Sequence, residues 1–202
     1  MFKRDKNKVI TIEEIKKYIE VFSTHYLPKL QKLDRYYRGK NDAIMNRTFK
    51  DASKPNFKIV SPYASYITDN FTSYFVGKPI TINSTNTDML NTFNAIFNYN
   101  DSQSNDITIA RNMSTYGYGA ELLYIDADKQ IRFSALDPKQ VIPIYSDDID
   151  GELLYCIRFY ETKDILSNKI DTFIEVYSDT EVIKWISSDN GVVKISSEEH
   201  YF

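Results

Sequence analysis

Between residues 61 and 76, hydrophobic side chains recur at intervals of three and four positions, which places them on one side of an α-helix. This side carries six large residues, Tyr63, Tyr66, Ile67, Phe71, Tyr74 and Phe75. The opposite side carries Ser65, Thr68, Asp69, Thr72 and Ser73. The pattern predicts a central helix whose aromatic side is buried in the core. Asn70 lies near the middle of that side, so its amide is expected to need hydrogen-bond partners.

Residues at both ends of this helix predict where it begins and ends. Ser61 is a candidate N-cap, and Pro62 suits the first helical position, where its missing N–H is not needed. Gly77 can adopt the left-handed conformation that ends a helix, and Pro79 prevents continuation. Short strands are expected on either side, at Lys58–Val60 and Ile80–Ile82.

The first 55 residues predict a helical pair followed by a loop. Thr11-Ile12-Glu13-Glu14 is a capping box, so a helix is expected to begin at Thr11. Pro28 starts or kinks a second helical segment that runs up to Gly39, which indicates an antiparallel or bent pair. Residues 40–55 are polar and lack periodicity, and they predict a loop.

After the central helix the pattern changes from helical spacing to short β-rich runs. Two further helices are predicted from hydrophobic spacing, the second ending around Gly117 and Gly119. Seven strands are predicted, at Glu121–Ile125, Ile131–Ala135, Val141–Tyr145, Glu152–Glu161, Thr172–Tyr177, Glu181–Ile186 and Val192–Ile195. Helices first and strands second predict an α+β fold with an antiparallel β meander, and argue against a doubly wound nucleotide-binding fold.

These elements suggest two regions. Residues 1–55 would form the helical pair and loop, and residues 56–202 an α+β region. Within the second region the central helices are expected at 61–116 and the β meander at 120–196.

Three stretches together resemble the portal proteins of long-tailed bacteriophages. The first contains Asn56, Lys58, Ile59, Val60, Tyr63, Ile67, Asp69 and Tyr74, and ends in Gly77-Lys78-Pro79-Ile80. The second is Tyr36-Tyr37-Arg38-Gly39. The third comprises Leu136-Asp137-Pro138, Ile144-Tyr145-Ser146-Asp147 and the run Tyr155–Tyr160. Their order and spacing carry the resemblance, which covers roughly residues 10 to 180.

The resemblance implies a structural subunit of a head-to-tail connector. Such portals are homo-oligomeric rings, conventionally dodecamers, at one capsid vertex of the virion. Viral DNA packaging and DNA ejection take place through the ring, which assembles in the host cytoplasm. The implied partners are other copies of the chain, the terminase motor, major capsid or scaffold proteins, head-completion proteins and the double-stranded DNA.

The resemblance also implies that this chain is the N-terminal part of the portal wing, truncated at its C-terminus. The tunnel-lining residues would then lie beyond Phe202, and the DNA-contacting residues are unknown. The alternative is another phage head-tail adaptor or structural interaction module. An incomplete wing predicts an open sheet edge near Val192–Phe202, whereas a complete adaptor domain predicts a paired and covered last strand. A third hypothesis is an enzyme, such as a nuclease accessory domain.

Charge is distributed unevenly along the chain. Residues 1–58 contain 15 Lys and Arg against 7 Asp and Glu, a net charge of +8, while residues 59–202 contain 10 against 21, a net charge of −11. The basic part fits either solvated helix faces or a charge-complementary interface. The longest apolar run, Leu153–Ile157, is too short to cross a membrane, so no membrane partner is expected.

Motifs for catalysis or cofactor binding are incomplete. Gly77-Lys78 lacks the other residues of a phosphate-binding loop, and a helix end accounts for it better. Asp148-Ile149-Asp150-Gly151 resembles part of a calcium loop, but position 12 is Ile157, so a hairpin turn is favoured. Asp126 and Asp128 frame a similar turn.

The residue types that bind zinc or act as nucleophiles are scarce. His25 and His200 are the two histidines and Cys156 is the one cysteine, too few for a zinc site or a Cys/His pair. We expect Cys156 to be a buried structural residue. The sequence thus predicts no catalytic, metal-binding or cofactor-binding residue, and a protein that is not an enzyme.

Overall fold

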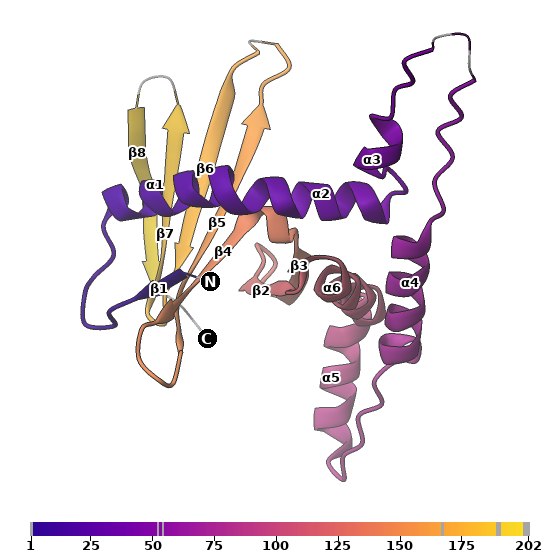
Figure 1. Ribbon diagram of the computed structural model, residues 1–202. Helices are drawn as coiled ribbons and strands as arrows, with labels where there is room; N and C mark the ends of the chain where they lie inside the picture. The colour runs from indigo at the N-terminus through magenta and orange to yellow at the C-terminus, as the bar shows by residue number, and fades with distance from the viewer. Residues whose placement is uncertain (1, 52, 54, 167, 189–190, 200–202) are drawn as a thin grey trace. The chain divides into compact units, whose positions relative to one another are not determined.

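A computed structural model describes residues 2–51, 53, 55–166, 168–188 and 191–199. The described residues form two compact units (Figure 1). The sheet unit is formed by two segments, Met1–Leu27 and Lys139–Phe202, and the helical unit by one segment, Pro28–Pro138. This division differs from the expected regions 1–55 and 56–202, because the N-terminal segment packs with the C-terminal strands.

The sheet unit contains a six-stranded sheet in the order β1-β4-β5-β6-β7-β8. Its strands are β1 Phe2–Arg4, β4 Val141–Ser146, β5 Leu153–Lys163, β6 Ile170–Tyr177, β7 Glu181–Ser188 and β8 Gly191–Glu199. From β4 to β8 each strand pairs antiparallel with the next, as the predicted meander requires. β1 pairs parallel with β4, with Phe2 opposite Ile144. Three residues are too few to show alternation, so the sequence did not predict β1.

The apolar core of the sheet unit lies on β4, β5 and β6. Its fully or almost fully buried strand residues are Val141, Ile142, Ile144, Ile157, Ile174 and Val176. Helix α1, Ile12–Val21, and the π-helical segment η1, Phe22–Tyr26, lie against the sheet (Figure 1). Ile15 is fully buried, and the ring of Phe22 meets that of Phe159 edge-on at 5.8 Å. The side of α1 and η1 that carries Ile15 and Phe22 is therefore buried.

Pro28 lies at the start of a second helical segment, as predicted, but no loop separates this segment from the first. α1, η1 and α2, Leu27–Tyr37, follow one another without a loop, so an antiparallel pair is wrong. In η1 the N–H of Leu27 bonds to the carbonyl of Phe22, which is five residues earlier. This wider turn precedes Pro28, whose ring would clash with the fourth preceding carbonyl in a regular α-helix. The proline is thus accommodated within a helical run.

The helical unit contains four further helices and a hairpin. The helices are α3 Asp42–Met45, α4 Tyr63–Val76, α5 Thr87–Tyr99 and α6 Ser102–Tyr116. The hairpin pairs β2 Ala120–Ile125 with β3 Ile131–Leu136. α6 contacts α4, α5 and β3, so it is the element around which this unit is built (Figure 1). The short helix α3, capped by the Asn41 side chain, lies within the predicted loop 40–55.

The prediction that the aromatic side of α4 is buried is wrong. The residues that α4 buries are Thr68 and Thr72, on the side predicted to be exposed. They lie against α6, where Ala110 is 2% exposed, and the Ser114 hydroxyl donates to Thr68 Oγ1 at 3.4 Å. Small side chains on both helices allow the two backbones to approach closely. Asn70 is likewise exposed, and its amide donates to the carbonyl of Tyr66 at 2.7 Å.

The ends of α4 also differ from the prediction. Pro62 occupies the N-cap position without a side-chain cap, because the carbonyl of Ser61 accepts from the Tyr63 N–H and closes a tight turn. Gly77 ends the helix in the right-handed conformation, with φ −69°, and not in the left-handed one. Neither Lys58–Val60 nor Ile80–Ile82 is a strand.

Most other local predictions are confirmed. All seven predicted strands are present, which confirms the α+β fold. Thr11 and Glu14 form the predicted capping box, and Gly117 ends α6 in the left-handed conformation, with φ 87°. Among the described residues β8 pairs only with β7 and lies at the sheet edge. The end of the expected open edge, residues 200–202, lies outside the described residues.

Candidate interaction surface

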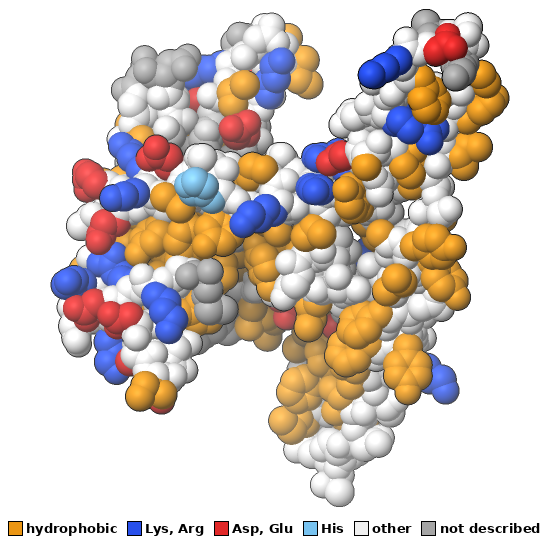
Figure 2. All heavy atoms as spheres, viewed as in Figure 1, with side chains coloured by type: hydrophobic (Ala, Val, Ile, Leu, Met, Phe, Trp, Pro, Cys, Tyr) orange, Lys and Arg blue, Asp and Glu red, His pale blue; other side chains and the backbone are white. Residues whose placement is uncertain are grey.

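Among the described residues, the aromatic side of α4 forms a large exposed apolar surface. We call it the α4 face and define it by Tyr63, Tyr66, Ile67, Phe71, Tyr74 and Phe75. Their exposed fractions are 70%, 65%, 64%, 46%, 95% and 62%. Figure 2 shows these hydrophobic side chains gathered along α4. Phe71 and Phe75 stack at 5.8 Å, but that contact leaves most of the face in solvent.

Polar contacts at the back and at one end of α4 hold this face outward. The Tyr37 hydroxyl donates to Asp69 Oδ1 at 2.9 Å, and Gln103 Nε2 donates to the carbonyl of Val76 at 2.7 Å. Burial and the Asp69 carboxylate raise the pKa of Tyr37, so this hydroxyl stays protonated and can donate. Together with the Thr68 contact to α6, these bonds set the rotation of α4 about its axis.

The chain on both sides of α4 extends the apolar surface. Phe57 and Ile59 before the helix are 69% and 80% exposed, and Ile80 after it is 74% exposed. Between residues 56 and 82 the only charged residues are Lys58, Asp69 and Lys78. Large side chains bury roughly 150–250 Å² each, so the six residues of the α4 face expose on the order of 800 Å². This exceeds the largest apolar patch of a typical monomer, about 300–600 Å².

The composition of the α4 face favours protein binding over catalysis. Tyrosine and phenylalanine are enriched at the centres of protein interfaces, where charged residues are depleted. Nucleic-acid binding would instead require several cations positioned for phosphates. The α4 face therefore has the composition of the centre of a protein–protein interface.

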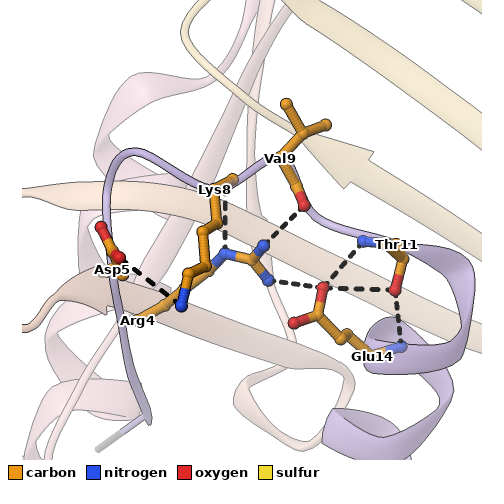
Figure 3. A network of polar contacts seen from close by, with 6 residues as sticks. All are labelled: Arg4, Asp5, Lys8, Val9, Thr11 and Glu14. Atoms are coloured by element: carbon orange, nitrogen blue, oxygen red, sulfur yellow. Dashed lines mark hydrogen bonds and ion pairs between the residues drawn. The ribbon is translucent and has the colours of Figure 1, made fainter.

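Arg4 forms a second polar cluster, in the sheet unit (Figure 3). Its side chain is only 5% exposed, and Nη1 donates to Glu14 Oε2 at 2.8 Å. Nη2 donates to the carbonyl of Val9 at 2.6 Å, and Nε to that of Lys8 at 3.2 Å. The Arg4 guanidinium and the Thr11 N–H hold the pKa of Glu14 below its usual value. These bonds join β1 to the start of α1, so Arg4 has a structural role.

The loop between β4 and β5 is a hydrogen-bonded turn. Asp148 accepts from the hydroxyl of Ser146 and from the Gly151 N–H, and it pairs with Lys6 at 2.9 Å. The hydrogen bond from the Ser146 hydroxyl and, to a smaller extent, the one from Lys6 lower the pKa of Asp148 to about 2. These protein partners support the predicted hairpin turn over a calcium loop. Asp126 likewise closes the β2–β3 turn by accepting from the Asp128 and Gln130 N–H groups.

The candidate chemical residues lie on separate elements where the structure describes them. Cys156 is half-buried on β5 and not fully buried as expected, and its partial burial raises the pKa of its thiol to about 11, which disfavours the nucleophilic thiolate. His25 lies in η1, whereas His200 lies outside the described residues. Within the described ranges, no three His, Cys, Asp or Glu residues are grouped so as to hold a metal ion. Lys78 follows the end of α4.

The part of the chain that the structure describes contains no candidate membrane-spanning helix. None of its helices combines the length and apolar character that a bilayer span requires.

Comparison with known proteins identifies similar sequences. The family model described as "Phage portal protein, SPP1 Gp6-like" matches residues 16–202. The portal protein of Bacillus phage SPP1 is 27% identical over 174 residues. The matched region covers 81% of this chain and 34% of that relative, so the chain spans about a third of the relative's length.

Proposed function

The chain belongs to the SPP1 Gp6-like family of phage portal proteins, and on this premise we propose that it forms the wing part of a ring-shaped portal. The ring would occupy one vertex of the capsid and serve as the head-tail connector of the virion. Double-stranded DNA would pass through it during packaging and ejection. The observation that carries this proposal is the family match over residues 16–202.

We propose a structural role and not a catalytic one. A separate terminase would supply the energy for packaging, and the ring would act as the conduit. Burial of the Cys156 thiol and the hydrogen-bonded turn around Asp148 support structural roles for the residues that the sequence marked as possible chemical groups. Major capsid or scaffold proteins and head-completion proteins would bind the ring. Assembly would take place in the host cytoplasm.

Self-assembly is the part of this proposal that the surface supports. The α4 face is large, apolar and free of charged residues at its centre. A surface of this kind is typical of a protein that functions in an assembly. A ring requires a head-to-tail contact between two different surfaces, which closes after a fixed number of copies. We propose twelve copies, the conventional number for portals.

The mass of the purified 202-residue chain tests ring formation. Native mass spectrometry and negative-stain electron microscopy should show closed rings with the mass of a single multiple of 23.6 kDa. A chain that stays monomeric at all accessible concentrations, or that grows into open filaments, would contradict the ring. The mass also gives the number of copies directly.

A further inference from the structure

We propose that the α4 face binds a second copy of this chain. In that copy it would contact the acidic C-terminal segment of the sheet unit, residues 139–199. The inference rests on the proposed ring and goes beyond it by naming both contacting surfaces. It starts from the exposed fractions of the α4 face, 46% to 95%.

The size of the α4 face agrees with a subunit contact. Stable interfaces bury about 800 Å² on each partner, which matches the area on the order of 800 Å² that this face exposes. Phe57, Ile59 and Ile80 add to it from the flanking chain.

A lysine lies in the chain on either side of α4. Lys58 precedes the helix and Lys78 follows it, and Arg47 donates to the carbonyl of Phe57 at 2.6 Å. Residues 28–58 contain nine Lys and Arg against three Asp and Glu, a net charge of +6. The α4 face itself is therefore uncharged and the chain before it is basic, so it fits an apolar partner surface with acidic surroundings.

This charge pattern disfavours a symmetric contact of the α4 face with itself. In an antiparallel arrangement Lys58 of one copy would lie near Lys78 of the other, and in a parallel arrangement each lysine would lie near its own counterpart. Like charges would meet in both cases, which disfavours the pairing. The partner surface must therefore be a different part of the second copy.

The C-terminal segment of the sheet unit, residues 139–202, provides the complementary charge. Residues 139–202 contain six Lys and Arg against thirteen Asp and Glu, a net charge of −7. The same segment also exposes apolar side chains, with Ile165 at 88%, Leu166 at 95% and Val193 at 59%. A contact between the α4 face of one copy and this segment of the next is head-to-tail, the type that closes a ring.

Charge-introducing substitutions at the centre of the α4 face test the proposal. Tyr74→Glu, alone and with Tyr66→Glu, places a carboxylate at positions that are 95% and 65% exposed. Val9→Glu is the matched control, because Val9 is 82% exposed but lies outside both proposed surfaces. Sedimentation velocity over a concentration series measures assembly, while circular dichroism and Tm measure folding. We expect the Tyr74 variants to assemble on the order of thirtyfold more weakly, with Tm unchanged, and Val9→Glu to assemble normally.

The possible results separate this inference from the proposed function. If the unmodified chain assembles and the Tyr74 variants assemble equally well, the α4 face is not the contact, while the ring stands. If the unmodified chain stays monomeric, the ring itself fails. If the variants lose Tm but keep their assembly, the face contributes to the folding of the chain and not to the contact, and the proposal is wrong.

Cross-linking between copies identifies the partner surface. A carbodiimide joins lysine amines to carboxylates in contact, and mixing isotopically light and heavy copies distinguishes links between copies from links within one. We expect Lys58 and Lys78 to link to carboxylates of residues 139–199 in the other copy. Links from these lysines only to residues 28–138 of the other copy would overturn the proposed partner surface.

Discussion

Arg4 connects three parts of the sheet unit through one side chain. It donates to Glu14 and to the carbonyls of Val9 and Lys8, and its guanidinium lies 5.9 Å from the ring centre of Tyr155. A buried cation is stable only where partners replace its lost hydration. Every side-chain nitrogen of Arg4 has such a partner, which explains how a three-residue strand is held in the sheet.

We predict that Arg4→Met lowers the free energy of unfolding by about 2–3 kcal/mol, because it removes charge-assisted hydrogen bonds and leaves acceptors unpaired. Lys3→Met on the same strand is the control, since Lys3 is exposed, and it should change stability by less than about 0.5 kcal/mol. Urea denaturation monitored by circular dichroism measures both. Equal effects of the two substitutions would show that the Arg4 bonds contribute nothing specific.

In helix α4 the side with small polar residues packs against the rest of the helical unit, whereas the side with large apolar residues stays exposed. α4 packs against α6, where Ser114 contacts Thr68, and Ala110 of α6 and Thr72 of α4 are both buried. Large aromatic side chains at this contact would force the two helices apart. The partner helix therefore decides which side of α4 is buried in the single chain.

Thr72 gives a test of this packing. Its hydroxyl is buried and has no hydrogen-bond partner among the described residues. Thr72→Val keeps the shape and removes the unpaired group, so we predict an increase in unfolding free energy of about 1 kcal/mol. Thr68→Val is the matched comparison one turn earlier, and it should give no gain because it loses the contact with Ser114. Thermal denaturation of both variants would show the difference, and a destabilised Thr72→Val would contradict the packing described.

At the scale of the whole molecule, charge is separated along the chain. The net charge is +8 over residues 1–58 and −11 over residues 59–202. Complementary charges on two copies accelerate their encounter and suppress wrong orientations, more than they strengthen the final complex. Charge would therefore steer the copies, and the apolar contact would hold them.

We predict that assembly slows when salt screens these charges. Raising the salt concentration from about 0.05 M to about 0.5 M shortens the screening length from above 10 Å to below 8 Å. The association rate should fall by about tenfold or more, whereas dissociation should change little. Stopped-flow light scattering of the purified chain measures both rates. An association rate that does not respond to salt would count against charge steering.

Local sequence patterns determined the position of most elements. Hydrophobic spacing, the Thr11–Glu14 capping box and Gly117 depend on neighbours within a few residues, so they can be identified without the fold. The strands of the meander were predicted for the same reason. The quoted stretches around residues 36–39, 56–80 and 136–160 also predicted the portal family, which the match to residues 16–202 confirms.

Only the tertiary structure decided which surfaces are buried. A pattern of large and small residues shows that α4 has two unlike sides, but the side that packs depends on α6, which begins 26 residues after α4 ends. β1 is similarly set by pairing with β4, far along the chain, and by the partners of Arg4. Burial depends on shape and on hydrogen bonds contributed by distant residues, and the spacing of one segment contains no information about them.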